Sequence, residues 1–296
     1  MKTSSLSVVV ATVEPWPEIQ ICLESLVGQA RSMKVEVIVA DGSGQGLPSD
    51  PSYSDIIWLR ETGATVSQLR ALGLVQSKGD IVAFTEDHCR VSHDWCEQII
   101  KLHDKYPNAA AIGGVIENGA THSILDWVHF MIANGPFMNP ISSGETRSLS
   151  GQANVSFKRK FLPVETSDMG IVQMFFNRDL FRRGLKLMMD NRLVVWHIQS
   201  LGLSGTCKMH FHTGRNIAGF RIQQLSGLGR MLRLMSCIIL PFFLIMRTLY
   251  TVFKKRRYRF KLIIGLPILF LLAICHTTGE CLGYISGPGN SPLMVR

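Results

Sequence analysis

Three consecutive side chains that can bind a metal ion follow a predicted buried strand. Residues 81–85 read Ile-Val-Ala-Phe-Thr, and Glu86, Asp87 and His88 come directly after them. Carboxylate and imidazole groups at the carboxyl end of a parallel strand can reach a divalent ion, which would neutralise a diphosphate leaving group. Acidic residues after strands are also common in solvated loops. The triplet alone therefore leaves two interpretations open, a metal site and a surface loop.

Two earlier predicted strands also end in polar side chains. The strand at 6–12 runs into Thr12 and Glu14, and the strand at 35–44 closes with Asp41 in an Asp-Gly-Ser-Gly turn. Asp41 taken alone is first of all a turn residue. In parallel α/β sheets, however, functional groups gather at the carboxyl ends of the strands. We therefore expect all three sets of side chains to lie on one edge of one sheet.

The elements around these residues alternate between strand and helix. β-Branched runs predict the strands, and apolar residues at helical spacing predict the helices. Such alternation is typical of βαβ units, so we predict an α/β fold with a mostly parallel sheet and helices on both faces. The predicted strands are 6–12, 35–44, 56–61, 81–85, 109–118 and two short pieces within 185–197, and the predicted helices are 18–30, 65–79, 96–107, 123–135 and 172–184.

Apolar and basic residues gather near the end of the 296-residue chain, whose net charge is +9. Residues 234–246 are apolar but contain Pro241 and fall short of the ~20 residues that span a bilayer. A second apolar stretch runs from 262 toward 285, and the basic run 254–261 lies between the two. Basic clusters beside apolar segments predict contact with an anionic membrane face. Nucleic acid is not expected as a partner, because the basic residues form no aromatic-rich stripe and no zinc-ligand spacing occurs.

The sidedness of the predicted membrane segment follows from its charge. Positive loops favour the cytoplasmic face, so we expect the large domain on that side of the cytoplasmic membrane. The sequence leaves two arrangements of the apolar stretches possible. Either both are shallow, re-entrant segments, or the second stretch alone spans the membrane. We predict a catalytic domain at 1–228 and a membrane-associated helical tail at 229–296.

The cysteine pattern and the turn after the first strand argue against disulfide-rich, zinc-binding and dinucleotide-binding proteins. The seven cysteines are odd in number and form no CxxC pair, which argues against a disulfide framework or a zinc ribbon and fits a reducing compartment. The first strand continues into Thr-Val-Glu-Pro-Trp-Pro without a GxGxxG turn. A dinucleotide-dependent enzyme is therefore not expected.

Three segments in order resemble the nucleotide-sugar half of a family 2 glycosyltransferase with the GT-A fold. They read "VVVATVEPWPEIQICLESLVGQ", "VEVIVADGSG" and "RALGLVQSKGDIVAFTEDHCRVSHDW", and the resemblance covers most of residues 6–197. It implies that Asp41 contacts the nucleoside and that the loop with Thr12 and Glu14 encloses the base. It also implies that Arg70, in the helix before the fourth strand, approaches the nucleotide.

The same resemblance implies roles for the three residues of the triplet. The Asp-x-Asp motif of the family falls on Glu86, Asp87 and His88, with both outer aspartates replaced. It implies that Glu86 and Asp87 face the nucleotide sugar, and that Asp87, His88 and His197 bind the metal. His197 stands where the family carries a histidine after a later strand. Because imidazole is a softer ligand than carboxylate, the histidine favours Mn²⁺ over Mg²⁺.

The expected general base is replaced in this chain. The resemblance places an acid about eleven residues before the glycine of "RRG", and Gln173 stands there. An amide cannot usefully take the proton of an acceptor hydroxyl. Asp168, nearby upstream, is our candidate for this role. Arg215 resembles an arginine that precedes the membrane part in related transferases and would meet a diphosphate or a lipid phosphate, although a basic membrane-proximal helix explains it equally well.

The sequence therefore predicts an inverting glycosyltransferase. It would move a sugar from a nucleotide-diphosphate sugar to a lipid-linked or polysaccharide acceptor at the cytoplasmic membrane face. The alternative is a non-catalytic or weakly active nucleotide-sugar-binding partner of another transferase, which the glutamine at 173 favours.

Overall fold

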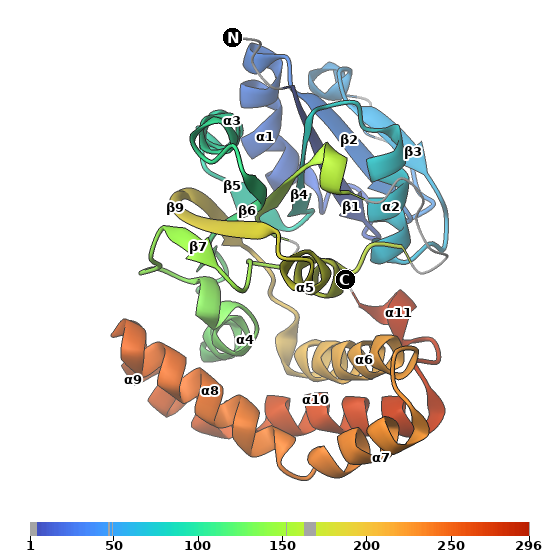
Figure 1. The fold of residues 1–296 in the computed structure, drawn as a ribbon, viewed down its shortest axis with the longest axis vertical. Helices are drawn as coiled ribbons and strands as arrows, with labels where there is room; N and C mark the ends of the chain where they lie inside the picture. The colour runs from blue at the N-terminus through green and yellow to red at the C-terminus, as the bar shows by residue number, and fades with distance from the viewer. Residues whose placement is uncertain (1–4, 47, 49, 152, 163–169, 296) are drawn as a thin grey trace. The chain divides into compact units, whose positions relative to one another are not determined.

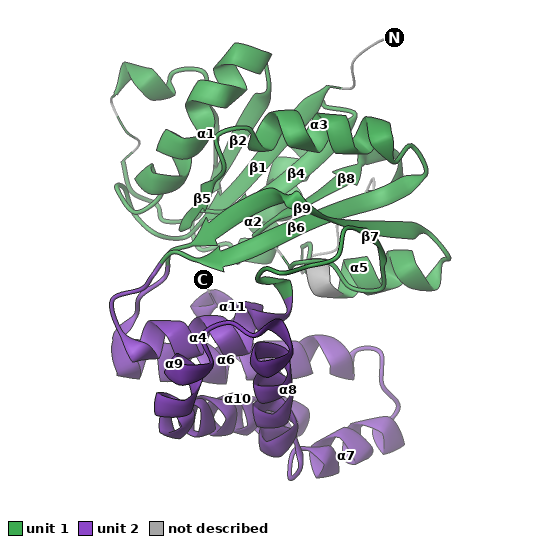
Figure 2. Ribbon diagram, turned by 90° about the vertical axis from the view of Figure 1, so that its left-hand side faces the viewer, with its two compact units in different colours: residues 1–119, 137–198 green, residues 120–136, 199–296 purple. Residues whose placement is uncertain are grey.

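The computed structural model of the chain describes residues 5–46, 48, 50–151, 153–162 and 170–295. Its contacts divide the chain into two compact units. Figure 2 colours them separately: unit 1 comprises residues 1–119 and 137–198, and unit 2 comprises residues 120–136 and 199–296. Unit 1 contains the sheet with its helices, and the described part of unit 2 is helical.

Unit 1 is built on one sheet, labelled in Figure 1. Its strands run in the order β3-β2-β1-β4-β8-β6-β9-β5, and β7 pairs with β9. The strands are β1 (Leu6–Thr12), β2 (Glu36–Asp41), β3 (Ile57–Arg60), β4 (Ile81–Glu86), β5 (Cys89–Val91), β6 (Ala109–Asn118), β7 (Gly144–Thr146), β8 (Val155–Lys158) and β9 (Lys186–His197).

The first four strands confirm the parallel arrangement expected from the sequence. β1 pairs in parallel with both β2 and β4, and β2 pairs in parallel with β3. Every residue of β1 is buried, as expected for a strand covered on both faces. Beyond β4 the sheet is mixed, because β8 inserts antiparallel between β4 and β6.

Helices cover both faces of this sheet, as predicted. α1 and α3 pack against one another on one face. Residues of α2 and α5 share a hydrophobic core with β1, β4 and β8 on the other face. The α-helices are α1 (Gln20–Met33), α2 (Val66–Gln76), α3 (Trp95–Lys105) and α5 (Gln173–Arg182), and the 3-10 turns are η1 (Pro51–Tyr53) and η3 (Arg159–Phe161).

The sequence predicted two short strands within 185–197, whereas the structure has the single strand β9. Its pairing with β6 shifts register between Gly113 and Val115. At the shift, Asp190 accepts hydrogen bonds from the backbone N–H of Arg192 (3.1 Å) and from its Nε (2.9 Å). The polar residues that looked like a break between strands therefore form a local irregularity within one strand.

Unit 2 consists of helices that contain the predicted membrane segments. α10 is long and apolar enough to cross a membrane by length and composition. α7 and α8 pass the same test only as a pair, and they are bent by 63° at the break between them. The helices are α4 (Ile124–Asn134), η2 (Gly135–Phe137, which reaches the boundary with unit 1), α6 (Gly202–Ile222), α7 (Gly227–Ser236), α8 (Leu240–Lys255), α9 (Arg259–Ile264), α10 (Leu266–Ser286) and α11 (Ser291–Met294).

The boundary between the compact units differs from the expected division at residue 228, because α6 packs along α10. A Cβ atom added to Gly214 of α6 would lie 2.1 Å from the carbonyl oxygen of His276. One added to Gly279 of α10 would lie 1.9 Å from the carbonyl oxygen of Phe211. Only glycine permits so close an approach of two helix backbones, so α6 belongs with the helices that follow it.

Candidate functional site

The strand ends bring the predicted polar residues to one edge of the sheet. Thr12, the last residue of β1, is in register with Asp41 at the end of β2. On the other side, Ala11 is in register with Glu86 at the end of β4. The edge expected from the sequence is therefore confirmed for residues 12, 41 and 86, and Asp87 and His88 follow β4 directly.

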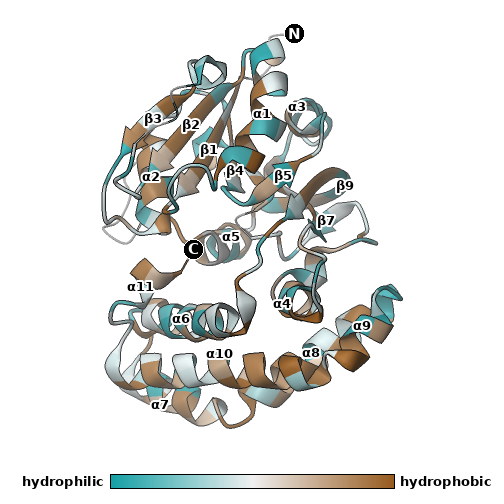
Figure 3. Cartoon of the chain, turned by 180° about the vertical axis from the view of Figure 1, so that it is seen from behind, coloured by the Kyte–Doolittle hydropathy of each residue, from teal (hydrophilic) through white to brown (hydrophobic). Residues whose placement is uncertain are grey.

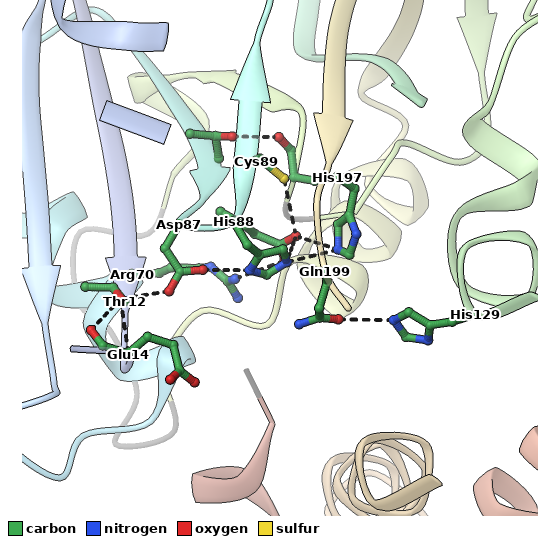
Figure 4. Close-up of polar contacts among 12 residues, drawn as sticks. Thr12, Glu14, Arg70, Asp87, His88, Cys89, His129, His197 and Gln199 are labelled. Carbon is green, nitrogen blue, oxygen red and sulfur yellow. Dashed lines mark hydrogen bonds and ion pairs between the residues drawn. The ribbon is translucent and has the colours of Figure 1, made fainter. Parts of the chain in front are cut away.

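Asp87 connects the first strand to the histidine of the triplet (Figure 4). Its Oδ2 accepts a hydrogen bond from the Thr12 hydroxyl (2.7 Å), and its Oδ1 lies 2.7 Å from Nδ1 of His88. Burial acts to raise the pKa of the Asp87 carboxyl, but the hydrogen bonds from His88 and Thr12 and the charge of His88 outweigh it and hold the pKa below its usual value. Asp87 is therefore an ionised, buried acceptor that fixes the orientation of the His88 ring.

Three ligand atoms converge beside Asp87. Nε2 of His88 lies 3.0 Å from Nε2 of His197, and the two rings meet edge to face. Oε2 of Glu86 lies 3.5 Å from the first nitrogen and 3.7 Å from the second. Burial acts to lower the pKa of His88, but the bonded Asp87 carboxylate and Glu86 outweigh it and raise the pKa.

The backbone of β9 explains how His197 reaches the triplet. His197 is in antiparallel register with Cys89 of β5 and in parallel register with Asn118 of β6. The carbonyl of His88 accepts a hydrogen bond from the N–H of Ile198 (2.9 Å). The imidazole is thus held opposite His88 by strand pairing rather than by a flexible loop.

Arg70 lies behind the triplet on α2. The helix begins with a capping box in which Thr65 and Gln68 satisfy one another's backbone N–H groups, and this fixes the start of the helix. The Arg70 side chain is 3% exposed, and its Nη2 lies 3.5 Å from Oε1 of Glu86. Burial lowers its pKa, opposed by Glu86 and Asp87. Within the described part of the chain, its Nε has no hydrogen-bond partner.

Asp41 and Glu14 lie on the same edge with different local roles. Oδ1 of Asp41 accepts a hydrogen bond from the N–H of Ser43 (2.8 Å), the Asx turn expected for Asp-Gly-Ser-Gly. The backbone N–H of Glu14 donates to the Thr12 hydroxyl (3.2 Å). The turn after β2 and the loop after β1 are therefore both ordered by side-chain hydrogen bonds.

The convergent atoms fit a divalent metal ion. Metal–nitrogen and metal–oxygen bonds near 2.1 Å place neighbouring ligand atoms about 3.0–3.4 Å apart. The three separations here are 3.0, 3.5 and 3.7 Å. In addition, His88 Nδ1 bonds a carboxylate, which is the usual outer partner of a metal-binding histidine. Two imidazoles and one carboxylate form a donor set that suits first-row divalent ions better than Mg²⁺.

Three predicted site residues are not among the side chains described at this edge. Asp168 lies outside the described residues. Gln173 is the first residue of α5. Arg215 lies on α6 in unit 2, where its Nε donates to the carbonyl of Gly287 (3.0 Å). The roles predicted for these three residues remain predictions.

Glu86 and Cys89 complete the edge. The sequence placed Glu86 in the metal-binding motif and assigned it to the nucleotide sugar, and its carboxylate faces both histidines. Cys89 was not considered, and its Sγ lies 4.0 Å from Oε2 of Glu86. Burial raises the pKa of this thiol well above its usual value, and its Sγ and the ligand atoms of Glu86 and His88 lie within 4.8 Å of one another, so Cys89 is a further candidate ligand. The only available signal was its position immediately after the triplet.

Comparison with known proteins finds similarity in sequence and in fold. Over 130 residues the chain is 27% identical to a glucosyl-dolichyl phosphate glucuronosyltransferase of Haloferax volcanii; the match covers 42% of this chain and 39% of that protein. The fold resembles that of a mannosyltransferase from Pyrobaculum calidifontis, solved with GDP-Man and Mn²⁺, with a TM-score of 0.56, 13% identity and coverage of 96% and 88% of the two chains. GalNAc-T7, solved with UDP, GalNAc and Mn²⁺, has a TM-score of 0.49 at 14% identity over 68% of this chain and 45% of that chain.

The family comparison covers the sheet from β1 to β8 and ends before β9, the strand that carries His197. The family model described as "Glycosyl transferase family 2" matches residues 7–181, which is more than half of the chain. The match begins in β1, includes both the Asp41 turn and the triplet, and ends within α5. The chain belongs to glycosyl transferase family 2.

Proposed function

We propose that the protein is an inverting glycosyltransferase that uses a nucleotide-diphosphate sugar. It transfers the sugar to a lipid-linked or polysaccharide acceptor at the cytoplasmic face of the membrane. The observation that carries the proposal is the triangle of His88 Nε2, His197 Nε2 and Glu86 Oε2 at the carboxyl edge of a parallel sheet, with separations of 3.0–3.7 Å.

The donor nucleotide occupies the edge formed by β1 and β2. Asp41 accepts hydrogen bonds from the nucleoside, and the loop with Thr12 and Glu14 encloses the base. Arg70 supplies positive charge near the diphosphate through the guanidinium that Glu86 holds in place. The Arg70 Nε, which lacks a partner in the described residues, is a donor ready for an anionic oxygen.

A divalent ion would be held by Glu86, His88 and His197. The chemistry that such an ion supplies is neutralisation of the charge on a diphosphate leaving group. Asp87 keeps Nδ1 of His88 protonated and so leaves the Nε2 lone pair free for a ligand bond. The mixed imidazole and carboxylate set favours Mn²⁺ over Mg²⁺, and the mannosyltransferase of similar fold was solved with Mn²⁺.

Acceptor activation is assigned to the segment before α5 and to its first residue. Asp168 takes the proton of the acceptor hydroxyl as that hydroxyl attacks the anomeric carbon, and the nucleoside diphosphate leaves with the electrons of the broken bond. Gln173 stands in the position of the usual acid and binds the acceptor sugar through its amide. Arg215, on α6 of unit 2, contributes a cation toward a phosphate of the donor or of a lipid acceptor.

The membrane part of the proposal rests on two observations. Unit 2 contains long apolar helical segments beside the basic run 254–261, and the relative from Haloferax volcanii is a glucosyl-dolichyl phosphate glucuronosyltransferase. The chain matches only 39% of the length of that relative. The acceptor and the cytoplasmic orientation are therefore inferred mainly from the apolar and basic residues of 227–275.

Transfer assays on the purified full chain test this function. The protein is incubated with a panel of nucleotide sugars and a polyprenyl phosphate acceptor, with Mn²⁺, with Mg²⁺ and with chelator. We expect release of a nucleoside diphosphate with one donor, greater in Mn²⁺ than in Mg²⁺ and lost in His197→Ala. Turnover that is unchanged by chelator and by this substitution would refute the role of the triangle.

A second candidate function is favoured by Gln173, which cannot act as a base. In that case the chain binds a nucleotide sugar without transferring it and serves another transferase. Donor binding by calorimetry without turnover for any donor, acceptor or metal would select this function.

A further inference from the structure

Unit 2 exposes a continuous set of large apolar side chains on α7 and α8. On α7, Leu228, Met231, Leu232 and Met235 follow helical spacing, and each is more than half exposed. The opposite side of α7 faces the unit, where Arg230 donates through Nη2 to the carbonyl of Ile285 (2.6 Å). An amphipathic helix with its apolar side outward is typical of an element that lies in a membrane interface.

The same surface continues through the link and along α8. In the link between the two helices, Ile238 is 72% exposed and Ile239 is 67% exposed. Figure 3 shows the apolar character of α8 and α10 in unit 2. The inner side of α8 is packed, because Leu244, Thr248 and Val252 are buried. We call this exposed set the apolar face; its members are Leu228, Met231, Leu232, Met235, Ile238, Ile239, Phe242, Phe243, Met246, Tyr250, Phe253, Phe260, Ile263 and Ile264.

The charge of this region identifies the chemistry of its partner. Residues 227–275 contain nine Lys or Arg and no Asp or Glu. On α8, Nζ of Lys254 lies 5.5 Å from the ring centroid of the exposed Tyr250. Aromatic and basic side chains beside an apolar surface are typical of the headgroup region of a membrane. A surface so basic and so apolar fits an anionic bilayer better than a second copy of itself, whose equal charge would repel it.

The packing of α10 argues against a membrane crossing. Its last turns are joined to α6 by a buried polar cluster, in which Nη1 of Arg221 lies 2.6 Å from Oε2 of Glu280 and 2.9 Å from the hydroxyl of Tyr284. The glycine contacts hold the backbones of the two helices together over the same region. α6 also carries Lys208 and Arg215. A crossing by α10 would therefore carry a charged partner helix into the hydrocarbon, where such residues are unfavourable.

The α7–α8 pair does not provide a span either. α8 has 16 residues, which at 1.5 Å per residue is about 24 Å and falls short of a hydrocarbon core of about 30 Å. α7 continues it only after the 63° bend. A bent pair with an apolar outer side can lie within one leaflet.

We propose that unit 2 is a monotopic anchor that binds the surface of an anionic bilayer. The apolar face enters one leaflet, the basic residues of 254–261 contact lipid headgroups, and α10 does not cross. This goes beyond the proposed transferase activity, since it concerns the mode of membrane binding, and it stands whether or not the chain transfers sugar.

Vesicle flotation of the full chain tests the apolar face. The probes are vesicles of phosphatidylcholine with and without phosphatidylglycerol. The double variant Ile238→Glu/Phe242→Glu should reduce binding at least about tenfold, because both side chains lose their place in the leaflet. Val75→Glu is the matched control, since Val75 of unit 1 is 58% exposed and lies outside the apolar face. Unchanged binding in the double variant would overturn the proposal.

A second variant keeps the test valid if the first fails to fold. Lys254→Gln/Lys255→Gln removes two positive charges without adding a charge to the apolar face, and it should weaken binding to phosphatidylglycerol vesicles by about fivefold per residue, and less at high salt. Circular dichroism and the thermal unfolding midpoint report that each variant is folded. If the double glutamate variant instead converts a lipid-independent dimer into a monomer, the apolar face binds a second copy and the proposal is wrong.

Protease protection on sealed vesicles distinguishes the anchor from a span. Epitope tags are placed before residue 5, between Arg256 and Arg257, and after residue 296. A monotopic anchor leaves all three tags open to protease added outside. A single crossing by α10 protects the last tag, and a hairpin of two crossings protects the middle tag. Protection of either tag would overturn the proposal.

Discussion

The substitution Asp87→Asn tests how one carboxylate orients a histidine. Oδ1 of Asp87 accepts from Nδ1 of His88, so the Nε2 lone pair faces Glu86 and His197. Thr12 donates to Oδ2, and an amide in the same place would therefore turn its oxygen to Thr12 and its NH2 group to His88. The ring proton of His88 would then move to Nε2, the atom that we assign to the metal.

The size of the effect follows from this geometry. Outer partners of metal-binding histidines change metal affinity by about 10–100-fold, which corresponds to about 1.4–2.7 kcal/mol of binding free energy. Titration of Mn²⁺ into the full chain by calorimetry measures it directly. The ¹⁵N shifts of the His88 ring report the tautomer independently.

The controls separate an orienting role from direct ligation. His88→Ala removes a ligand and should cost more than Asp87→Asn. Asp104→Asn, at an exposed position of α3, should change nothing. An unchanged affinity in Asp87→Asn would refute the reasoning, and a loss as large as that of His88→Ala would make Asp87 itself a ligand, as the sequence predicted.

Three further substitutions address the nucleotide, the base and the fold. Asp41→Ala should weaken nucleoside diphosphate binding by about 10–100-fold even without metal, since it removes a charged hydrogen-bond acceptor; equal dissociation constants would contradict this. Asp168→Asn should abolish transfer and leave donor binding intact, while Gln173→Glu should change turnover little. A rise in turnover of about 10²–10⁴-fold in Gln173→Glu would instead assign the general base to position 173. Asn154→Ala should lower the free energy of unfolding by about 3 kcal/mol, because its side chain bonds Trp95 Nε1 and the carbonyls of Val115 and Leu193; denaturant unfolding beside the exposed control Asn191→Ala measures this.

The part of the site that local sequence patterns could predict is the parallel half of the sheet. The β-branched run 6–12 and the apolar run 81–85 predict strands, and right-handed βαβ connections make them parallel. Parallel strands end at one edge, so the neighbourhood of Thr12, Asp41 and Glu86 followed without knowledge of any side-chain contact.

The part that local patterns could not predict depends on pairings between distant segments. His88 and His197 are 109 residues apart, and their contact requires the antiparallel pairing of β5 with β9. A three-residue strand such as β5 carries no periodic signal of its own. Likewise, the grouping of α6 with α10 depends on glycines that allow backbone contact, and single glycines in a helix do not indicate which partner approaches them.

The net charge of the side chains in and around the triangle predicts that metal binding and nucleotide binding are coupled. Glu86 and Asp87 contribute two carboxylates, and Arg70 contributes one guanidinium in contact with Glu86. A histidine at position 88 in place of the family aspartate removes one negative charge from the site. The attraction for a free divalent ion is therefore reduced, and the diphosphate of the donor supplies the missing charge.

We expect Mn²⁺ to bind about 5–150-fold more tightly when a nucleoside diphosphate is present, with the same factor in the reverse direction. Calorimetry of Mn²⁺ with and without saturating UDP or GDP measures the factor. His88→Asp is the informative variant, because it restores the carboxylate and should tighten binding of the ion alone while reducing the coupling. Equal Mn²⁺ affinity with and without nucleotide in the wild-type chain would show that the triangle and the diphosphate do not share the ion, and the proposed place of the diphosphate beside Arg70 would then be wrong.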